Sequence, residues 1–578
     1  MSYQLMFQKA VELQQNGALN EAEQIYRQIL ETAPQNADVL NLLGLIAQTK
    51  GIHNEAVSYF YRAIENAPKH FPIYFNLAIS LGALGRYVEA TEAYHKVLEF
   101  KKDCKEAYLG LGNIYWAQNK TDEAKLAFQN ALNIDNQYRE AQTNLAELKD
   151  DVETLQNICS NNPQALFYLG RRAFSSNDYT KATEYFLQAD NLISDDEIKT
   201  MLGESLLAQK QSEKALQKFY QAVQINEHNV TALVNIADME AQNNNFQQAE
   251  KYYKKALEND EKNLRAHANY ANMLCQNKRT LEALEEYRQA VIISPQSPEL
   301  SYNLALILKS LEEYEQALDL MFHAFYLDSS HTDWSLNIAE TLVLFHNNAP
   351  EKAKKICENW YEKMPENLVV KHLWSALNNQ TSDIESAYNR LLFDNFAESY
   401  EKTLQNIGYS VADKIAALYA PLNGTILDLG CGTGLLGLKI KNPQNKITGV
   451  DVSENMLKIA GEKDVYQELI NQDIMEYLQN PHPDFDCVVA ADVFCYFGDL
   501  ENIIGSVFPN RLIFSIESNQ DTETYVLQAN GRYQHNPEYI KQILQKVGYD
   551  IIKTDSLILR QENGHDVSGY IFMAESSK

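Results

Sequence analysis

The sequence predicts two folds in one chain: an all-α superhelix of helical repeats, followed by an α/β domain built on a mostly parallel sheet. Three observations predict this: a small-residue pattern that recurs along the first two thirds, a change near Tyr388 to short Ile- and Val-rich runs, and a glycine-rich turn after the first such run. We expect the repeats to occupy residues 1–370, a linker residues 371–387 and the α/β domain residues 388–578. A chain of 578 residues is too long for one hydrophobic core.

The composition indicates a folded protein with neither a nucleic acid nor a membrane as partner. Gly and Pro are few (23 and 14) among 45% hydrophobic residues, which favours helix over loops. The net charge is −28, and neither half has a basic cluster that could displace phosphate counterions. We find no apolar run long enough for a membrane span and no classical export signal. The seven cysteines lack CxxC spacing, so we expect reduced thiols, no metal site and a cytoplasmic location.

A repeat with a period of 34 residues runs through the first two thirds of the chain. Its marks are a small residue, an alanine twelve residues later and an aromatic four residues after that, as in Gly44, Ala56 and Phe60. The small residues let paired helices approach closely, and the aromatic fills the space between neighbouring units. This pattern resembles the tetratricopeptide repeat, a pair of antiparallel helices, with about nine matching units. The resemblance implies a superhelix that recruits a protein or peptide.

Two interruptions of the repeat are expected. Near residues 148–165 the second helix of a unit is too short for the period and is cut off at Pro163, which predicts a kink or register change. After Met321 the pattern loosens into a unit with a two-residue insertion. We interpret this last unit as a cap or a docking face.

One position of the repeats carries asparagine in six units. These residues are Asn76, Asn144, Asn235, Asn269, Asn303 and Asn337. A side-chain amide offers both a donor and an acceptor, so a ladder of them along the concave face could bind the backbone of an extended peptide. The alternative is that asparagine serves local hydrogen bonding within the repeats.

A glycine-rich turn, "LDLGCGTGLLG" at residues 427–437, follows the first expected strand of the α/β domain, where parallel sheets bind ligands. Its tail fits the GxGxxG turn of a dinucleotide site, but Asp428 stands two residues before Gly430 and would repel a pyrophosphate. A carboxylate there suits S-adenosylmethionine, which has no phosphate and carries an ammonium and a sulfonium. The order acid-x-Gly-x-Gly-x-Gly resembles motif I of class I methyltransferases. A nicotinamide dinucleotide is the alternative cofactor.

Acidic residues after the later strands agree with this resemblance, which implies a Rossmann-like fold with a seven-stranded sheet. Asp451 ends the second strand, where a carboxylate can accept both ribose hydroxyls. In this family the acid at Asp473 or its neighbour reaches the adenine amine, and Asp492 closes the fourth strand beside the methyl donor. The expected cofactor-binding residues are Tyr400, Asp428, Gly430, Cys431, Gly432, Gly434, Asp451, Val452, Met456, Asp473, Ile474 and Asp492.

Two flanking segments extend the resemblance over residues 388–578. The segment "LFDNFAESYEKTLQNIGY" resembles a lid helix with Phe393, Phe396 and Tyr400 over the cofactor, although the phenylalanines could equally form a core-facing stripe. The Asn-Gly pair in "SLILRQENGHDVSGYIFMAE" predicts the antiparallel hairpin that closes such sheets. Repeats followed by this domain, with "GRYQH" near the end, are similar to a bacterial group of predicted methyltransferases with tetratricopeptide repeats.

The methyl acceptor has to be inferred from the ends of the fourth and fifth strands and from the "GRYQH" segment. "AADVFCYF" after the fourth strand lacks an Asn/Asp-Pro-Pro-aromatic motif, which disfavours DNA adenine and glutamine amides. Asp492 or Glu517 could hold a lysine ammonium, and His535 could be a base for a hydroxyl or carboxyl-type acceptor, although a lone loop histidine is more often structural. The expected catalytic residues are Asp492, Tyr496, Glu517, Tyr533 and His535.

These observations favour an S-adenosylmethionine-dependent enzyme that methylates a protein side chain, with a nitrogen such as that of lysine as acceptor, recruited by the repeats. One alternative is methylation of a small molecule or a carrier-bound acyl group, with the repeats used for assembly. Another is a scaffold whose methyltransferase domain is degenerate.

Overall fold

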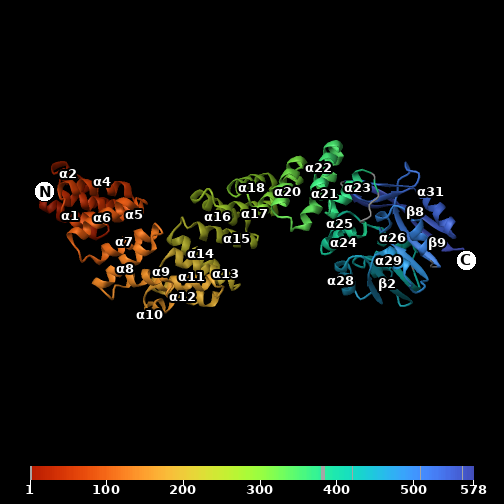
Figure 1. The fold of residues 1–578 in the computed structure, drawn as a ribbon, viewed down its shortest axis with the longest axis horizontal. Helices are drawn as coiled ribbons and strands as arrows, with labels where there is room; N and C mark the ends of the chain where they lie inside the picture. Colours follow the sequence, from red (N-terminus) through yellow and green to blue (C-terminus); the bar gives the residue numbers. More distant parts are fainter. Residues whose placement is uncertain are drawn as a thin grey trace. The chain divides into compact units, whose positions relative to one another are not determined.

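The computed structural model describes residues 3–378, 380, 385–419, 421–507, 510–562 and 564–577. By their internal contacts, the residues form two compact units, Met1–Ala266 and His267–Lys578. The first unit is wholly helical, and the second contains further helical pairs and then the sheet (Figure 1).

The first unit consists of antiparallel helical pairs. Its helices are α1 (Tyr3–Gln15), α2 (Leu19–Thr32), α3 (Ala37–Thr49), α4 (His53–Asn66), α5 (Phe71–Ala83), α6 (Tyr87–Phe100), α7 (Lys105–Ala117), α8 (Thr121–Ile134), α9 (Arg139–Lys149), α10 (Val152–Ile158), α11 (Pro163–Ser175), α12 (Tyr179–Leu192), α13 (Asp196–Ala208), α14 (Ser212–Ile225), α15 (Val230–Gln242) and α16 (Phe246–Asn259). Helix α17 (Leu264–Gln276) spans the division between the units.

Helices of the second unit come in two groups. The repeat pairs continue with α18 (Thr280–Ile293), α19 (Pro298–Ser310), α20 (Tyr314–Leu327), α21 (Thr332–Asn348), α22 (Pro350–Lys363) and α23 (Leu368–Leu377). The helices of the α/β region are α24 (Glu385–Phe396), α25 (Tyr400–Asn406), α26 (Val411–Tyr419), α27 (Leu435–Ile440), α28 (Glu454–Glu462), α29 (Ile474–Gln479), η1 (Phe494–Tyr496), α30 (Glu501–Ser506) and α31 (Pro537–Val547).

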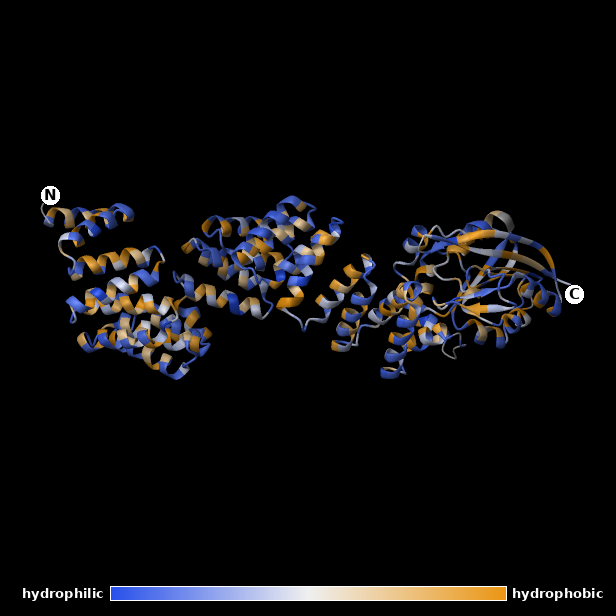
Figure 2. Cartoon of the chain, turned by 90° about the horizontal axis from the view of Figure 1, so that it is seen from above, coloured by the Kyte–Doolittle hydropathy of each residue, from blue (hydrophilic) through white to orange (hydrophobic). Residues whose placement is uncertain are grey.

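The repeat helices pair because small residues on one helix meet an aromatic side chain on the next. A Cβ atom added to Gly112 in α7 would lie 2.3 Å from Cε1 of Phe128 in α8, and Gly44 stands in the same relation to Phe60. Each helix mixes hydrophobic and hydrophilic residues (Figure 2), as expected for helices that bury one face. The predicted small–aromatic pairing is therefore the packing contact within a repeat.

The two expected irregularities are visible as changes of helix length. Helix α10 has 7 residues, whereas α8 and α12, the corresponding helices of flanking units, have 14 each. Helix α21 has 17 residues, against 13 for α19, in agreement with an insertion in the last unit.

The sheet has seven strands in the order β3-β2-β1-β4-β5-β9-β8. Its first five are parallel, and β9 and β8 are antiparallel additions. The strands are β1 (Gly424–Leu429), β2 (Asn445–Asp451), β3 (Glu468–Asn471), β4 (Cys487–Ala490), β5 (Arg511–Glu517), β8 (Tyr549–Glu562) and β9 (His565–Ser576). This is the expected mostly parallel sheet, and β8 and β9 form the predicted closing hairpin.

Apolar residues alternate between the two faces of the sheet. Ile426 of β1 packs with α26 and α27 on one face, and Leu427 joins the cluster that includes α30 and α31 on the other. Because both faces are covered by helices, the central strands β1, β4 and β5 are mostly buried.

A separate hairpin, β6 (Tyr525–Leu527) with β7 (Tyr533–His535), joins the α/β region to the last repeat helix. Leu527 and Tyr533 pack on Ala376 of α23. Gly531, in the turn, has a φ of 79°, and a Cβ there would lie 2.3 Å from Nε2 of His372. Within the segment expected as a linker, residues 371–377 belong to α23 and residues 385–387 to α24, while residues 379 and 381–384 lie outside the described residues. A domain boundary near Tyr388 stays a prediction.

The contact between Gly112 and Phe128 can be tested by substitution in the full chain. Gly112→Ala should lower the free energy of local unfolding of α7 and α8 by about 1–3 kcal/mol, because the added methyl group overpacks against a ring. Hydrogen exchange of the α7 and α8 amides measures this. Gly82→Ala is the control, because its Cβ would meet only the end of the Ile114 side chain, at 2.9 Å. Equal losses for both variants would contradict the account.

Candidate active site

The glycine turn after β1 curves because three of its glycines have positive φ angles. Gly430, Gly432 and Gly434 have φ of 63°, 54° and 85°. A Cβ at Gly430 would collide with Val493, at 2.6 Å from Cγ2. The turn is tied to β2 by N–H groups of Gly430 and Cys431, which donate to the Val450 carbonyl at 2.8 and 3.1 Å. Glycine is needed here for backbone conformation and for close approach.

A cavity of about 270 Å³ opens at the carboxyl ends of the parallel strands, beside this turn. Its walls come from the turn, from the ends of β2 and β4, from α24, and from the starts of α25, α28 and α29. The lining residues are Glu385, Ser386, Asn389, Phe393, Tyr400, Gly430, Gly432, Asp451, Val452, Met456, Asp473, Ile474, Met475, Ala491, Asp492, Val493, Tyr496 and Phe497. None of these described residues is Lys or Arg.

Most of the residues expected to bind a cofactor line this cavity. They are Tyr400, Gly430, Gly432, Asp451, Val452, Met456, Asp473, Ile474 and Asp492. Three others, Asp428, Cys431 and Gly434, are not part of its wall. Asp428 is 1% exposed, and its Oδ2 accepts a hydrogen bond from the Tyr466 hydroxyl at 2.7 Å. The expectation that the Asp428 carboxylate meets a ligand ammonium is therefore corrected. This carboxyl is buried beneath the turn, where it bonds to Tyr466.

Asp451 connects the cavity to the glycine turn. Its Oδ2 accepts from the Gly432 N–H at 2.8 Å and its Oδ1 from the Ser453 N–H at 2.9 Å. Burial raises the pKa of this carboxyl, while the two backbone donors act in the opposite direction. A carboxylate oxygen has two lone pairs, so each oxygen can still accept a hydroxyl from a ligand.

Helices α24 and α25 are fastened over the cavity by polar contacts to the sheet domain. Asp394 in α24 accepts from the Ser453 hydroxyl at 2.6 Å. Lys463 binds Glu401 of α25 at 2.6 Å. Phe393 and Tyr400 line the cavity as expected, whereas Phe396 is 38% exposed and does not.

Two arginines occupy the acidic ends of β4 and β5. Arg532, in the turn of the β6–β7 hairpin, donates to Asp492 at 2.9 Å and to Glu517 at 2.6 Å. Arg560, on β8, donates to the same two carboxylates at 3.2 and 2.5 Å. Burial acts to raise the pKa of Asp492, but the two guanidinium charges outweigh it and the pKa is lowered. The expectation that Asp492 or Glu517 holds a lysine ammonium is thus corrected, because both already pair with arginines.

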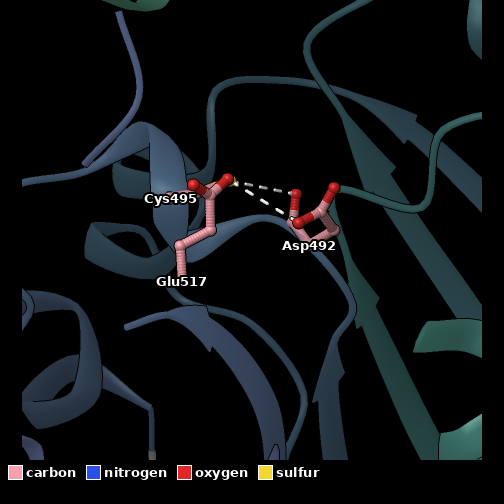
Figure 3. A group of neighbouring side chains, drawn as sticks. All are labelled: Asp492, Cys495 and Glu517. Atoms are coloured by element: carbon pink, nitrogen blue, oxygen red, sulfur yellow. Dashed lines mark hydrogen bonds between the residues drawn. The ribbon is translucent and has the colours of Figure 1, made fainter. Parts of the chain in front are cut away.

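Asp492, Cys495 and Glu517 bring three potential metal ligands within 4.8 Å of one another (Figure 3). The thiol of Cys495 contacts the backbone carbonyl and side chain of Asp492. Arg532 also donates to the Cys495 sulfur at 2.9 Å. A metal ion would have to displace or face two guanidinium groups, so the donor set does not fit a cation.

The other expected catalytic residues lie at different depths. Tyr496 lines the cavity, and its hydroxyl accepts from Arg532 at 2.9 Å. Tyr533 lies behind the wall and donates to Glu385 at 2.6 Å. His535 is fully buried, with Nε2 2.9 Å from the Gly498 carbonyl oxygen, and burial lowers its pKa to about 4. His535 therefore holds the hairpin to the loop after β4, and its expected role as a base is corrected.

Sequence reasoning missed Arg532, Arg560 and the first turn of α24. The signal that could have revealed Arg532 is its place in the "GRYQH" segment, beside the candidates Tyr533 and His535. Arg560 and Glu385 gave no signal, because their placement depends on the register of β8 and on the packing of α24.

Several asparagines of the predicted column bond to residues of the preceding repeat or of their own helix. In the first unit, Asn76 donates to Asn41 at 3.1 Å and Asn144 to Asn113 at 2.7 Å. Asn235 donates to Glu204 at 3.3 Å. In the second unit, Asn337 donates to the backbone of its own helix, at Asp333. These contacts are the local hydrogen bonds of the alternative interpretation, and they occupy donors that a peptide would otherwise use.

Comparison with known proteins agrees with the two folds. Residues 426–508 match the family described as methyltransferase domain. Residues 7–71 and 234–298 match one tetratricopeptide repeat family and residues 81–148 match another. The chain thus carries tetratricopeptide repeats and a C-terminal methyltransferase domain.

Individual relatives each match a part of the chain. The putative methyltransferase YqeM of Bacillus subtilis is 31% identical over 103 residues, which cover 18% of this chain and 42% of that protein. A ubiquinone biosynthesis O-methyltransferase of Thiobacillus denitrificans is 28% identical over 145 residues, 23% of this chain and 60% of that protein. The chain thus spans about half the length of the curated relatives it matches. The structure of a tetratricopeptide repeat protein of Parabacteroides merdae matches 40% of this chain and 97% of its own chain at 18% identity, with a TM-score of 0.36.

Among the described helices, none has the length and apolar character needed to cross a bilayer.

The buried carboxyl of Asp428 makes stability depend on pH in a defined direction. Burial raises its folded-state pKa from 3.8 to about 7. Its contribution to stability is therefore fully present below about pH 4 and is lost as the pH rises through 7. We expect the Tm of the wild-type chain to fall relative to that of Asp428→Asn across this range, in thermal unfolding scans.

The control is Asp486→Asn, because hydrogen bonds from Thr425 lower the pKa of Asp486. The contribution of Asp486 to the stability of the fold is present above the ordinary pKa of an aspartate and is lost as the pH falls. Parallel pH profiles for the wild type and Asp428→Asn would contradict the assignment.

Proposed function

We propose that this chain is an S-adenosylmethionine-dependent methyltransferase that acts on a protein side chain recruited by its repeats, with an amine nitrogen such as that of lysine as the acceptor. The observation that carries the proposal is the cavity beside the glycine turn. Its described wall contains the carboxylates Asp451 and Asp473 and no Lys or Arg, so it suits an adenosine ligand without phosphates.

The wall residues suit the adenosine part of S-adenosylmethionine. Asp451 at the end of β2 would accept the ribose hydroxyls. Val452, Met456 and Ile474 would enclose the adenine, and Gly432 permits close approach, since a Cβ there would meet nothing nearer than Tyr400 at 3.9 Å. The bound cofactor would supply a methyl group activated by a sulfonium. The residues of this chain then have to position the acceptor in line with it and exclude water.

Several residues are fixed in position for that task. Tyr496 is held by Arg532, whose guanidinium also lies 4.8 Å from the centre of its ring. Phe393 packs edge-on against both Tyr496 and Tyr400, at 5.3 and 6.2 Å between ring centres. These aromatic side chains form a rigid wall at the α24 end of the cavity. An intact glycine turn and an open cavity favour an active enzyme over a degenerate domain.

Support for a protein acceptor comes from the repeats. In the first unit, a hollow of about 540 Å³ is lined by Asn113, Trp116, Ala117, Asn119, Asn144 and Gln164. Asn113 and Gln164 are exposed and bond to the buried Asn144. Each of these two amides has further donor and acceptor capacity, which matches a peptide backbone, and the ring of Trp116 offers apolar contact. The hollow, rather than the whole asparagine column, is the surface we propose for recruitment.

O-methylation of a small molecule is the second candidate. A relative bears the name ubiquinone biosynthesis O-methyltransferase, and the aromatic wall of Phe393, Tyr400, Tyr496 and Phe497 could stack on a planar acceptor. In that case the repeats would serve assembly.

The two candidates differ in where a radioactive methyl group is transferred. Full-length protein and methyl-labelled S-adenosylmethionine are added to a lysate of host cells lacking the gene, and label is counted in protein and small-molecule fractions. We expect label in a protein, reduced about tenfold by Asn113→Ala with Gln164→Ala, since the lost hydrogen bonds total roughly 1.4 kcal/mol. The full chain is used because a fragment starting at Tyr388 would lack Glu385 and the helix that packs on the hairpin.

Gln129→Ala, an exposed change on α8 outside the hollow, is the matched control and should label like the wild type. Label only in small molecules would sink the protein-acceptor proposal. Equal protein labelling by all variants would remove the hollow from it.

A further inference from the structure

Two carboxylates meet at the start of α28, one from the sheet and one from the helix that covers the cavity. Asp451 ends β2 and lines the cavity, whereas Asp394 lies on α24 and is not part of the wall. Burial is the main cause that raises the pKa of Asp451, and the like charge of Asp394 adds to it. Asp394 thus opposes the ionised form of a carboxylate proposed to bind the cofactor, which indicates that it contributes something other than its charge.

Ser453 lies between the two carboxylates and bonds to both. It is fully buried and is the N-cap residue of α28. Its N–H donates to Oδ1 of Asp451 at 2.9 Å, and its hydroxyl oxygen accepts from the N–H of Met456 at 3.1 Å. The hydroxyl donates its proton to Oδ1 of Asp394 at 2.6 Å. A serine hydroxyl has a single proton, so Asp394 decides in which direction that proton points.

Asp451 needs every lone pair that its backbone partners leave. The N–H groups of Gly432 and Ser453 each occupy one lone pair, on different oxygens of the carboxylate. One lone pair then remains on each oxygen, which matches the two hydroxyls of a ribose. If Asp394 did not take the Ser453 proton, that hydroxyl could turn to the Asp451 oxygen that its own N–H already contacts. It would then occupy the place of a ribose hydroxyl.

Asp394 also holds α24 against the first turn of α28. Its Oδ1 accepts a second, longer hydrogen bond from the N–H of Asn455 at 3.4 Å, and its backbone carbonyl accepts from the Asn455 side chain at 3.0 Å. The preceding residue, Phe393, lines the cavity and packs edge-on against Tyr496. Docking of α24 therefore brings an aromatic side chain to the cavity and, at the same time, the acceptor for the Ser453 proton to α28.

We propose that Asp394 is a positioning residue for the cofactor site: it keeps the Ser453 hydroxyl turned away from Asp451, so that both oxygens of Asp451 stay open to the ribose hydroxyls. This rests on the function proposed above and deepens it. Asp394 acts through Ser453 and does not line the cavity. The ribose-binding site is complete only when α24 is docked on α28, so the closed form of the cavity is the one that recognises the cofactor.

The test compares two ligands that differ only in the ribose hydroxyls. The Kd values of S-adenosylhomocysteine and of its 2′,3′-dideoxy analogue are measured by calorimetry on the full-length chain, and their quotient is the hydroxyl preference. We expect the wild type to prefer S-adenosylhomocysteine about tenfold, because the hydroxyls gain hydrogen bonds to a carboxylate. Asp394→Ala should reduce the preference to about threefold, since one of the two hydroxyls loses its lone pair, and should leave the Kd of the dideoxy analogue unchanged.

Three further variants isolate the cause. Asp394→Asn retains an oxygen that can accept the Ser453 proton but loses the charge, so it should restore the wild-type preference. Adding Asp394→Ala to Ser453→Ala should cause no further change, because the hydroxyl that competes for Asp451 is already absent. Asn395→Ala, an exposed change next to Asp394 whose amide bonds to Leu391 of the same helix, is the matched control and should keep the wild-type preference.

Contrary results separate the possible failures. An unchanged preference in Asp394→Ala would overturn the role of Asp394, and so would equal losses of affinity for both ligands, which a purely structural role would cause. A reduced preference in Asp394→Asn would mean that the charge acts rather than the acceptor oxygen, and a further fall in the double variant would mean that Ser453 is not the intermediary. Either result overturns the proposal. A wild type that binds both ligands equally would overturn the ribose contact of Asp451 and the proposal with it. If the wild type binds neither ligand, the proposed function itself fails.

Discussion

The paired charges at the ends of β4 and β5 are the constraint on which the rest of the site depends. Asp492 and Glu517 lie close together in a buried place, where two carboxylates would repel each other. Arg560 on β8 and Arg532 on the β6–β7 hairpin each form ion pairs with both carboxylates, which offset this repulsion. Removing one member of such a group typically costs about 3–5 kcal/mol, because a buried charge is left without its partner. Four separate elements are therefore held together at one edge of the sheet.

This charge cluster connects the last repeat helix to the wall of the cavity. Arg532 fixes the hairpin, the hairpin carries Tyr533, and Tyr533 fixes Glu385 of α24. On its outer side the same hairpin packs on α23, the last repeat helix, through Gly531 and Tyr533. The α24 end of the cavity is therefore built partly from the end of the repeat array, within one compact unit.

The features that could be predicted from the sequence are those that depend on residues close together in the chain. The repeat period and the strand sequence depend on local patterns, so the helical pairs, the parallel sheet and the terminal hairpin were predictable, as were the turn glycines and Asp451 at the cavity. The pairing of Arg560 with Glu517 needs the antiparallel register of β8, 43 residues away, and no local pattern encodes it. Asp428 followed the expected motif, but its carboxyl turned inward to Tyr466. The asparagine column was recognised, whereas its bonds to neighbouring repeats depend on how the helices stack.

The central claim is that the cavity selects a methyl donor over a dinucleotide, and competitive titration of the full-length chain tests it most directly. S-Adenosylhomocysteine and NAD⁺ are titrated into the wild type, Asp451→Asn and the exposed control Asp464→Asn. The account predicts that S-adenosylhomocysteine binds the wild type and the control alike, that Asp451→Asn weakens it about tenfold through the lost charge-assisted hydrogen bonds, and that NAD⁺ does not compete. Tighter binding of NAD⁺ than of S-adenosylhomocysteine, or no effect of Asp451→Asn, would contradict it.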